Sequence, residues 1–215
     1  MNLSDAQFAT PPHASVIVVG AGPTGLVLAH LLGVYGIRTV LIDRESATVA
    51  QARAVTIDDE SLRSIQATGH LDAVLPHITQ GYGVHYYSWR QRLFARIDPT
   101  VCEYGYQRRN AFRQDVLVRQ LCERLTHQPD VQVRFEHELL SLEQGKDGVV
   151  LHMNTPTGPC TWTCDWLIAC DGGRSRIREQ LGVTLEGDTF GERWLIADLQ
   201  GRTSSFRHTR TYCDP

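Results

Sequence analysis

The chain has 215 residues, 42% of them hydrophobic, which is enough for one or two domains with a sizeable core. Its 21 basic and 24 acidic residues leave a net charge of -3, which argues against an electrostatic field for nucleic acid or an anionic membrane. The most apolar stretch, residues 16–35, is interrupted by glycines, a proline and a histidine, so we expect no signal peptide, no membrane span and a cytoplasmic location.

A glycine-rich turn lies near the start of the chain. The polar residues 1–14 are expected to form a flexible tail, and the apolar run 15–19 predicts the first strand. Residues 26–36 have the composition of a helix. The six residues that join this strand to this helix are Gly20-Ala21-Gly22-Pro23-Thr24-Gly25. A strand, a glycine turn and a helix in this order are typical of a site for the pyrophosphate of a dinucleotide.

The three glycines have different expected roles. Gly20 permits a tight turn, Gly22 lets backbone N–H groups approach phosphate, and Gly25 lets the helix pack closely on the strand. The next apolar run ends in Asp43, close to the spacing of a carboxylate that binds an adenosine ribose, and Arg44 follows, to cover an adenine face or lie in solvent. Because a carboxylate repels a 2'-phosphate, the pattern favours NAD-like or FAD-like adenosine over NADP. The alternatives are a turn that serves packing alone and a solvated carboxylate.

The middle of the chain alternates between helical and strand patterns. Residues 61–68 predict a helix, with a short turn at 71–75. Residues 81–97 are rich in aromatic and β-branched side chains and predict strands outside the nucleotide fold. Residues 110–125 return to helical spacing. Tyr86, Tyr87 and His85 could contact a substrate, although a core or edge-strand role is the simpler interpretation.

The later part of the chain predicts more strands. Residues 131–135, 149–153 and 161–163 are expected to form a β-meander, and 166–169 a short buried strand before a helix near 175–181. We therefore predict an α/β protein in two interleaved parts. A Rossmann-like dinucleotide-binding domain comprises residues 15–80 and 111–182, and a partial β-sheet domain comprises residues 81–110 and 183–215.

Three further segments carry residue types suited to a cofactor. Asp171-Gly172-Gly173 follows a strand, where a carboxylate can bind ribityl or ribose hydroxyls and glycine admits a phosphate. The alternative is a helix start capped by Asp171 or Ser175. Arg53 and the pair Arg113-Gln114 could contact phosphates or a flavin, or lie in a solvated loop and on the surface.

The cysteines and histidines suggest no metal site. The six cysteines lack a CxxC pair and the nine histidines are dispersed, so we expect reduced thiols without a metal ligand set. No catalytic triad is present in the pattern either, and no catalytic residue is assigned.

Taken in order, these segments resemble the FAD-dependent aromatic hydroxylases of the para-hydroxybenzoate hydroxylase fold, and most of all the 3-(3-hydroxyphenyl)propanoate hydroxylases. The resemblance rests on the glycine motif, Asp43-Arg44, Arg53, Arg113-Gln114 and Cys170-Asp-Gly-Gly173. The closer similarity lies in 53–63, 74–77, 108–112, 166–173 and 212–215. It extends over nearly the whole chain from Ser15.

The resemblance implies a three-layer ββα domain and a set of cofactor contacts. Gly20, Gly22 and Gly25 would hold the FAD pyrophosphate and Asp43 the ribose. Arg53 and Arg113 would line the flavin, and Asp171 would lie near FAD and the nicotinamide coenzyme. The implied reaction is hydroxylation of a phenolic aromatic acid by O₂, with NADH or NADPH as reductant and a flavin C4a-hydroperoxide as oxidant. The protein would supply orientation and a dry pocket.

The family continues beyond the position of Pro215, and the second flavin-binding Gly-Asp segment has no counterpart. Gly187-Asp188 has the same two residues, but it lacks the apolar strand and the helix that should flank this segment, so we expect a loop there. Apolar residues such as Trp194 would lack their covering, so we expect either a homo-oligomer or a complementing C-terminal chain. A truncated gene product, a fragment and half of a split enzyme all remain open. So do two other functions, a non-catalytic FAD-binding fragment and an NAD-binding dehydrogenase module.

Overall fold

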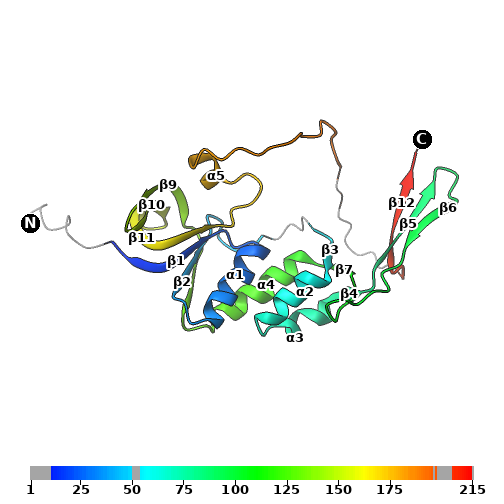
Figure 1. Cartoon of the computed structure of the whole chain (residues 1–215), viewed down its shortest axis with the longest axis horizontal. Coiled ribbons are helices and arrows are strands. Elements are labelled where there is room, and N and C mark those ends of the chain that lie inside the picture. Colours follow the sequence, from blue (N-terminus) through cyan, green and yellow to red (C-terminus); the bar gives the residue numbers. More distant parts are fainter. Residues whose placement is uncertain (1–10, 50–53, 196, 198–204, 215) are drawn as a thin grey trace, which may run out of the picture.

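The computed structural model describes residues 11–49, 54–195, 197 and 205–214. A large sheet with its helices occupies one end of the molecule. A small sheet formed by β5 (Gly83–Ser88), β6 (Leu93–Ile97) and β12 (His208–Cys213) occupies the other (Figure 1). After α5 (Arg176–Gln180), residues 181–195 form a long segment without helix or strand that leads away from the large sheet (Figure 1). No described helix has the length and apolar character needed to span a membrane.

The large sheet has six strands in the order β8-β2-β1-β11-β10-β9. Strands β1 (His13–Val19), β2 (Thr39–Ile42) and β8 (Val131–Arg134) are parallel, and β11 (Gly158–Ala169) continues the parallel set beside β1. The first strand begins two residues before the expected start at Ser15. His13 is paired with Thr163 and belongs to the sheet, so the tail predicted over 1–14 is too long at its end.

One strand joins the parallel part of the sheet to the meander. The first half of β11 pairs antiparallel with β10 (Gly148–Thr155), and its second half pairs parallel with β1. The two separate strands predicted at 161–163 and 166–169 are therefore a single strand. The meander is completed by β9 (Glu138–Gly145), whereas the segment predicted as its first strand is β8, which pairs with β2.

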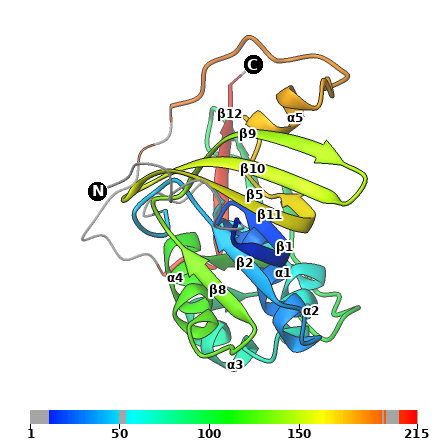
Figure 2. The same cartoon turned by 90° about the vertical axis from the view of Figure 1, so that its left-hand side faces the viewer.

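Alternate residues of β1 face two different cores, which makes three layers. Val16 and Val18 pack against the helices, while Ile17 and Val19 pack against β9 and β10. Figure 2 shows α1 to α4 on one side of β1 and β2, with β9 and β10 on the other. The helices are α1 (Pro23–Val34), α2 (Asp59–Ala67), α3 (Leu71–Val74) with the 3₁₀ turn η1 (Leu75–His77), and α4 (Gln114–Leu125). This architecture agrees with the predicted fold class.

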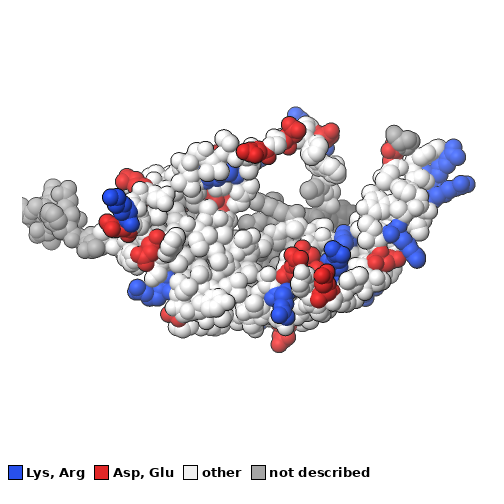
Figure 3. Space-filling view, viewed as in Figure 1, with Lys and Arg blue, Asp and Glu red and all other residues white. Residues whose placement is uncertain are grey.

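Two small sheets form the rest of the fold. One has the order β3-β7-β4, with β3 (Thr56–Asp58), β7 (Arg109–Phe112) and β4 (Ile78–Gln80). The helix predicted over 110–125 therefore begins late, because its first residues belong to β7. The other has the order β12-β5-β6, with β5 (Gly83–Ser88), β6 (Leu93–Ile97) and β12 (His208–Cys213). Basic side chains gather at this end of the molecule (Figure 3).

Candidate dinucleotide-binding site

The glycine turn is shaped by two close backbone approaches and one open position. Gly20 has φ of +110°, and a Cβ there would overlap the carbonyl oxygen of Cys170. A Cβ on Gly25 would overlap the carbonyl oxygen of Gly20 and lie 3.3 Å from the Cβ of Cys170. A Cβ on Gly22, by contrast, would have nothing within 4 Å. The turn thus needs glycine for packing at two positions and leaves free space at the third.

The free space lies at the start of α1. Gly22 is the N-cap of this helix, Pro23 is its first residue, and no side chain caps it in the part of the chain that the structure describes. The first turn contains no acidic residue, and Thr24 is exposed. The N-terminal end of a helix carries partial positive charge and donor N–H groups, so this position suits a phosphate.

Asp43 stands beside the turn, at the end of β2. Its Oδ2 accepts a hydrogen bond from the N–H of Ala21 at 2.6 Å, and its Oδ1 accepts one from the N–H of Glu45 at 2.9 Å. A carboxylate has about four acceptor sites, so this orientation leaves capacity for ribose hydroxyls. Arg44 is exposed, with Nε 3.3 Å from Oε1 of Glu45.

Asp171 and Gly172 reach the same edge of the sheet from β11. The N–H of Cys170 donates to the carbonyl of Val19 at 2.8 Å, which places Asp171 next to the glycine turn. Gly172 has φ of +85°, and a Cβ there would have nothing within 4 Å. The capping alternative is also present. Ser175 is the N-cap of α5, and Oδ2 of Asp171 accepts the N–H of Ile177 at 3.4 Å.

The predicted pair Arg113-Gln114 lies at the start of α4. The Arg113 side chain is 74% exposed, and its Nη2 lies 2.6 Å from Oδ2 of Asp115. The hydrogen bond from Arg113 is the main cause that lowers the pKa of Asp115. Gln114 is buried, and its Oε1 accepts the N–H of Ala54 at 2.8 Å, which holds the chain after residue 53 against α4. Arg53 itself lies outside the described residues.

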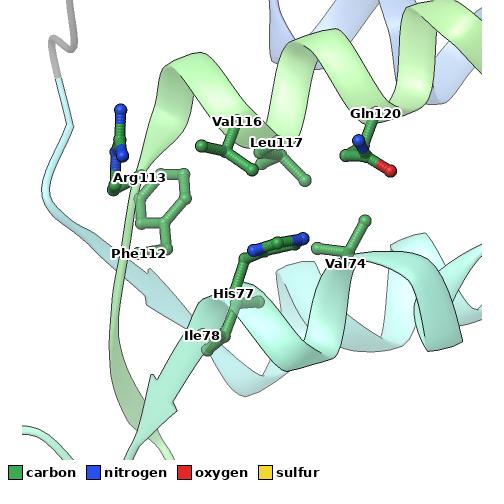
Figure 4. Close-up of a pocket in the computed structure, with 8 residues that line it drawn as sticks. All are labelled: Val74, His77, Ile78, Phe112, Arg113, Val116, Leu117 and Gln120. Carbon is green, nitrogen blue, oxygen red and sulfur yellow. The ribbon is translucent and has the colours of Figure 1, made fainter.

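Arg113 also borders a narrow apolar pocket between α3, η1 and α4. Figure 4 shows its guanidinium extending away from Val116 and Leu117, which line the interior. The interior leaves no room for a water molecule, so this pocket is a feature of helix packing and not a ligand cavity.

The thiols near the sheet are poorly suited to chemistry. Burial raises the pKa of Cys164 to about 11 and also raises that of Cys170, so both sulfurs stay protonated near neutral pH. Among the described residues, no three His, Cys, Asp or Glu side chains are grouped as a metal site would need.

One part of the site was not predicted. The backbone carbonyl of Cys170 forms a wall of the glycine turn, and the sequence carries no signal for it because a carbonyl is common to all residues. The structure brings together the glycine turn, Asp43 and Asp171-Gly172, and it places Arg113-Gln114 at the start of a neighbouring helix.

Known proteins match this arrangement. A family model described as FAD binding domain matches residues 13–212. The chain is 39% identical over 212 residues to the 3-(3-hydroxy-phenyl)propionate/3-hydroxycinnamic acid hydroxylase of Klebsiella pneumoniae (strain 342), and 38% identical to that of Escherichia coli (strain SMS-3-5 / SECEC). Each match covers 98% of this chain and 38% of the relative, so the chain spans well under half the length of these relatives.

The fold is also similar to those of solved monooxygenase structures. The p-nitrophenol 4-monooxygenase PnpA from Pseudomonas putida DLL-E4 has a TM-score of 0.78 at 28% identity, over 84% of this chain and 46% of that one. The flavin-dependent monooxygenase PieE, in complex with FAD and substrate, has a TM-score of 0.74 at 30% identity, over 84% of this chain and 34% of that one.

Proposed function

Because this chain belongs to the FAD binding domain family, we propose that its glycine turn, Asp43 and Asp171 bind FAD as part of a flavin-dependent aromatic hydroxylase. The observation that carries this proposal is the open space at Gly22 and Gly172, where a Cβ would have nothing within 4 Å. The two glycines follow the ends of the neighbouring strands β1 and β11. Such space beside exposed backbone N–H groups fits a pyrophosphate.

We propose one role for each of the predicted residues. The start of α1 would face the pyrophosphate, and Asp43 would accept hydrogen bonds from the adenosine ribose. Asp171 would contact FAD from the end of β11, and Arg53 and Arg113 would line the flavin. When bound, FAD would supply the redox chemistry, taking electrons from NADH or NADPH and activating O₂ for insertion of one oxygen atom into a phenol ring. The chain would bind and orient these groups and exclude water.

The substrate we propose is a phenolic aromatic acid like 3-(3-hydroxyphenyl)propanoate. The support is the name of the relatives at 38–39% identity. We assign hydroxylation to a complete protein or assembly, formed with a complementing C-terminal polypeptide or as a homo-oligomer. A second candidate is FAD binding without hydroxylation by this chain alone. It is favoured by the exposure of Trp194 (87%) and Leu195 (95%), which leaves apolar surface without cover.

A titration of the purified chain with FAD tests the proposal. We expect one FAD per chain by the visible flavin spectrum, with binding that an excess of NAD does not reverse. Asp43→Ala should weaken it, while Asp72→Ala, an exposed carboxylate on α3, should not. Folded protein that binds no FAD, or binds NAD more tightly, would contradict the proposal. Adding the phenolic acid with NADH or NADPH and analysing for hydroxylated product separates the two candidates.

A further inference from the structure

A second cleft lies away from the glycine turn, at the junction of two small sheets. It has a volume of about 490 Å³, within the range of ligand pockets. Strand β3 and the start of β7 line one part of the cleft, and residues 97–101, which begin with the last residue of β6, line the rest. Its lining combines apolar side chains, among them Ile57, Ile97 and Val101, with two arginines and two aspartates. The cleft is therefore suited to a ligand with an apolar body and a charged group.

The two arginines differ in how they are held. Arg109 donates from Nη1 to the carbonyl of Tyr82 at 2.6 Å and to that of Gly83 at 2.9 Å, and its Nη2 lies 3.4 Å from Oγ1 of Thr209. These neutral acceptors fix the guanidinium without cancelling its charge. Arg108 is exposed, and its side chain has no hydrogen bond or ion pair with any described residue. Its five N–H donors are available to a ligand.

The two aspartates of the cleft already have partners. Asp98 lies 3.4 Å from Nε2 of His85 and 3.2 Å from Nε of Arg96. Asp58 is the N-cap of α2, where its Oδ1 accepts the N–H of Ser61 at 2.7 Å and the helix dipole favours its charge. Neither carboxylate pairs with Arg108, so the Arg108 guanidinium has no described acidic partner in the cleft and can take an anionic ligand.

We propose that this cleft binds the carboxylate of an aromatic acid, with Arg108 as the residue that pairs with it. The planar guanidinium can form two parallel hydrogen bonds to a carboxylate, a geometry that lysine does not offer. Ile57, Ile97 and Val101 would contact the aromatic ring. This inference rests on the proposed function, because it locates the acid group of the proposed substrate, and it adds a binding residue outside the dinucleotide site.

Calorimetric titration of the FAD-treated chain with 3-(3-hydroxyphenyl)propanoate tests the assignment. Arg108→Gln should weaken binding of the acid about tenfold or more, the effect of losing a hydrogen bond to a charged group. The matched control is Arg90→Gln, which removes an exposed arginine stacked on Trp89 away from the cleft and should bind like wild type. The neutral methyl ester should bind wild type and Arg108→Gln equally. Thr100→Trp should narrow the cleft and weaken binding of both ligands.

The outcomes separate this inference from the proposed function. Binding of FAD together with acid binding that neither Arg108→Gln nor Thr100→Trp changes would overturn the cleft assignment and leave the FAD proposal standing. If the chain binds the acid in a way that depends on Arg108 but binds no FAD, the cleft assignment stands and the FAD proposal is overturned. A wild-type chain that does not bind the acid also overturns the assignment. Thermal melting of each variant shows whether it is folded, and Thr100→Trp provides the test if Arg108→Gln is not.

Discussion

Replacement of Gly25 by alanine should destabilise the chain, although the same change inside most helices is stabilising. The new Cβ would approach the carbonyl oxygen of Gly20 more closely than 3.0 Å, and both groups belong to the backbone. No side-chain rotation can relieve this contact, so the start of α1 must move away from the strand. Overpacking of this kind costs about 1–3 kcal/mol, and alanine returns about 0.5–1 kcal/mol of helix preference.

Because both groups belong to the backbone, the upper end of the overpacking cost applies, about 3 kcal/mol. The expected net loss for Gly25→Ala is then about 2 kcal/mol of unfolding free energy, equivalent to a fall in Tm of roughly 4–8 °C for a chain of this size. Gly22→Ala is the matched control. Its φ of -76° and ψ of 179° suit alanine, and the new Cβ meets nothing, so Tm should fall by less than about 3 °C. FAD affinity should nevertheless fall about tenfold or more, because the methyl group occupies the space proposed for the pyrophosphate.

Thermal melting without cofactor, followed by FAD titration of each folded variant, measures both effects. The two variants should behave differently. Gly25→Ala should show the larger loss of stability, and Gly22→Ala should lose FAD affinity without a comparable loss of stability. A Gly25→Ala protein that melts like wild type would refute the close approach. Wild-type FAD affinity in Gly22→Ala would refute the proposed position of the pyrophosphate.

Three other predictions follow from the site and its surroundings. Asp43→Asn should lower FAD affinity and cost about 1 kcal/mol of stability, measured by urea unfolding, because it weakens two hydrogen bonds to backbone N–H groups. Burial lowers the pKa of His30 from 6.5 to about 4, so the unfolded chain binds this proton before the folded chain does as the pH falls. The free energy of unfolding should therefore drop by on the order of 2 kcal/mol between pH 7 and 4.5, and His30→Gln should make it less dependent on pH. A thiol reagent at neutral pH should label the exposed Cys102 and Cys213 first and leave Cys164 unlabelled until the chain unfolds, as peptide mapping would show; early labelling of Cys164 would contradict its burial.

Local sterics made part of the site predictable from sequence. The positive φ of Gly20 and the close approach at Gly25 depend on residues only a few positions apart, together with the strand and helix patterns on either side. Asp43 could be placed at the turn because β2 is short and fully buried, so its end is marked clearly. That these groups bind FAD stays a prediction.

Features that depend on distant pairing were missed or misplaced. Strand β9 has one fully buried side chain, Leu139, so its alternation is weak and the neighbouring segment 131–135 was predicted as the meander strand instead. Strand β7 was hidden because its buried position is Asn110, a polar residue. Its Nδ2 donates to the carbonyls of Ile57 and Gln107. These hydrogen bonds allow the polar side chain to be buried, and the sequence pattern does not reveal them. The cleft at Arg108 was not predicted either, because its lining residues come from two different sheets.

The pairing of β1 with β11 also sets when the site can exist during synthesis. Partners such as His13 and Thr163 are 150 positions apart, and the wall of the glycine turn is the carbonyl of Cys170. At about 5–20 residues per second, a ribosome needs roughly 8–30 s to cover that distance. Throughout this interval the nascent chain carries an apolar strand with an open edge, which a chaperone can bind. The glycine turn, which lies near the start of the chain, is therefore completed only after Cys170 has been synthesised.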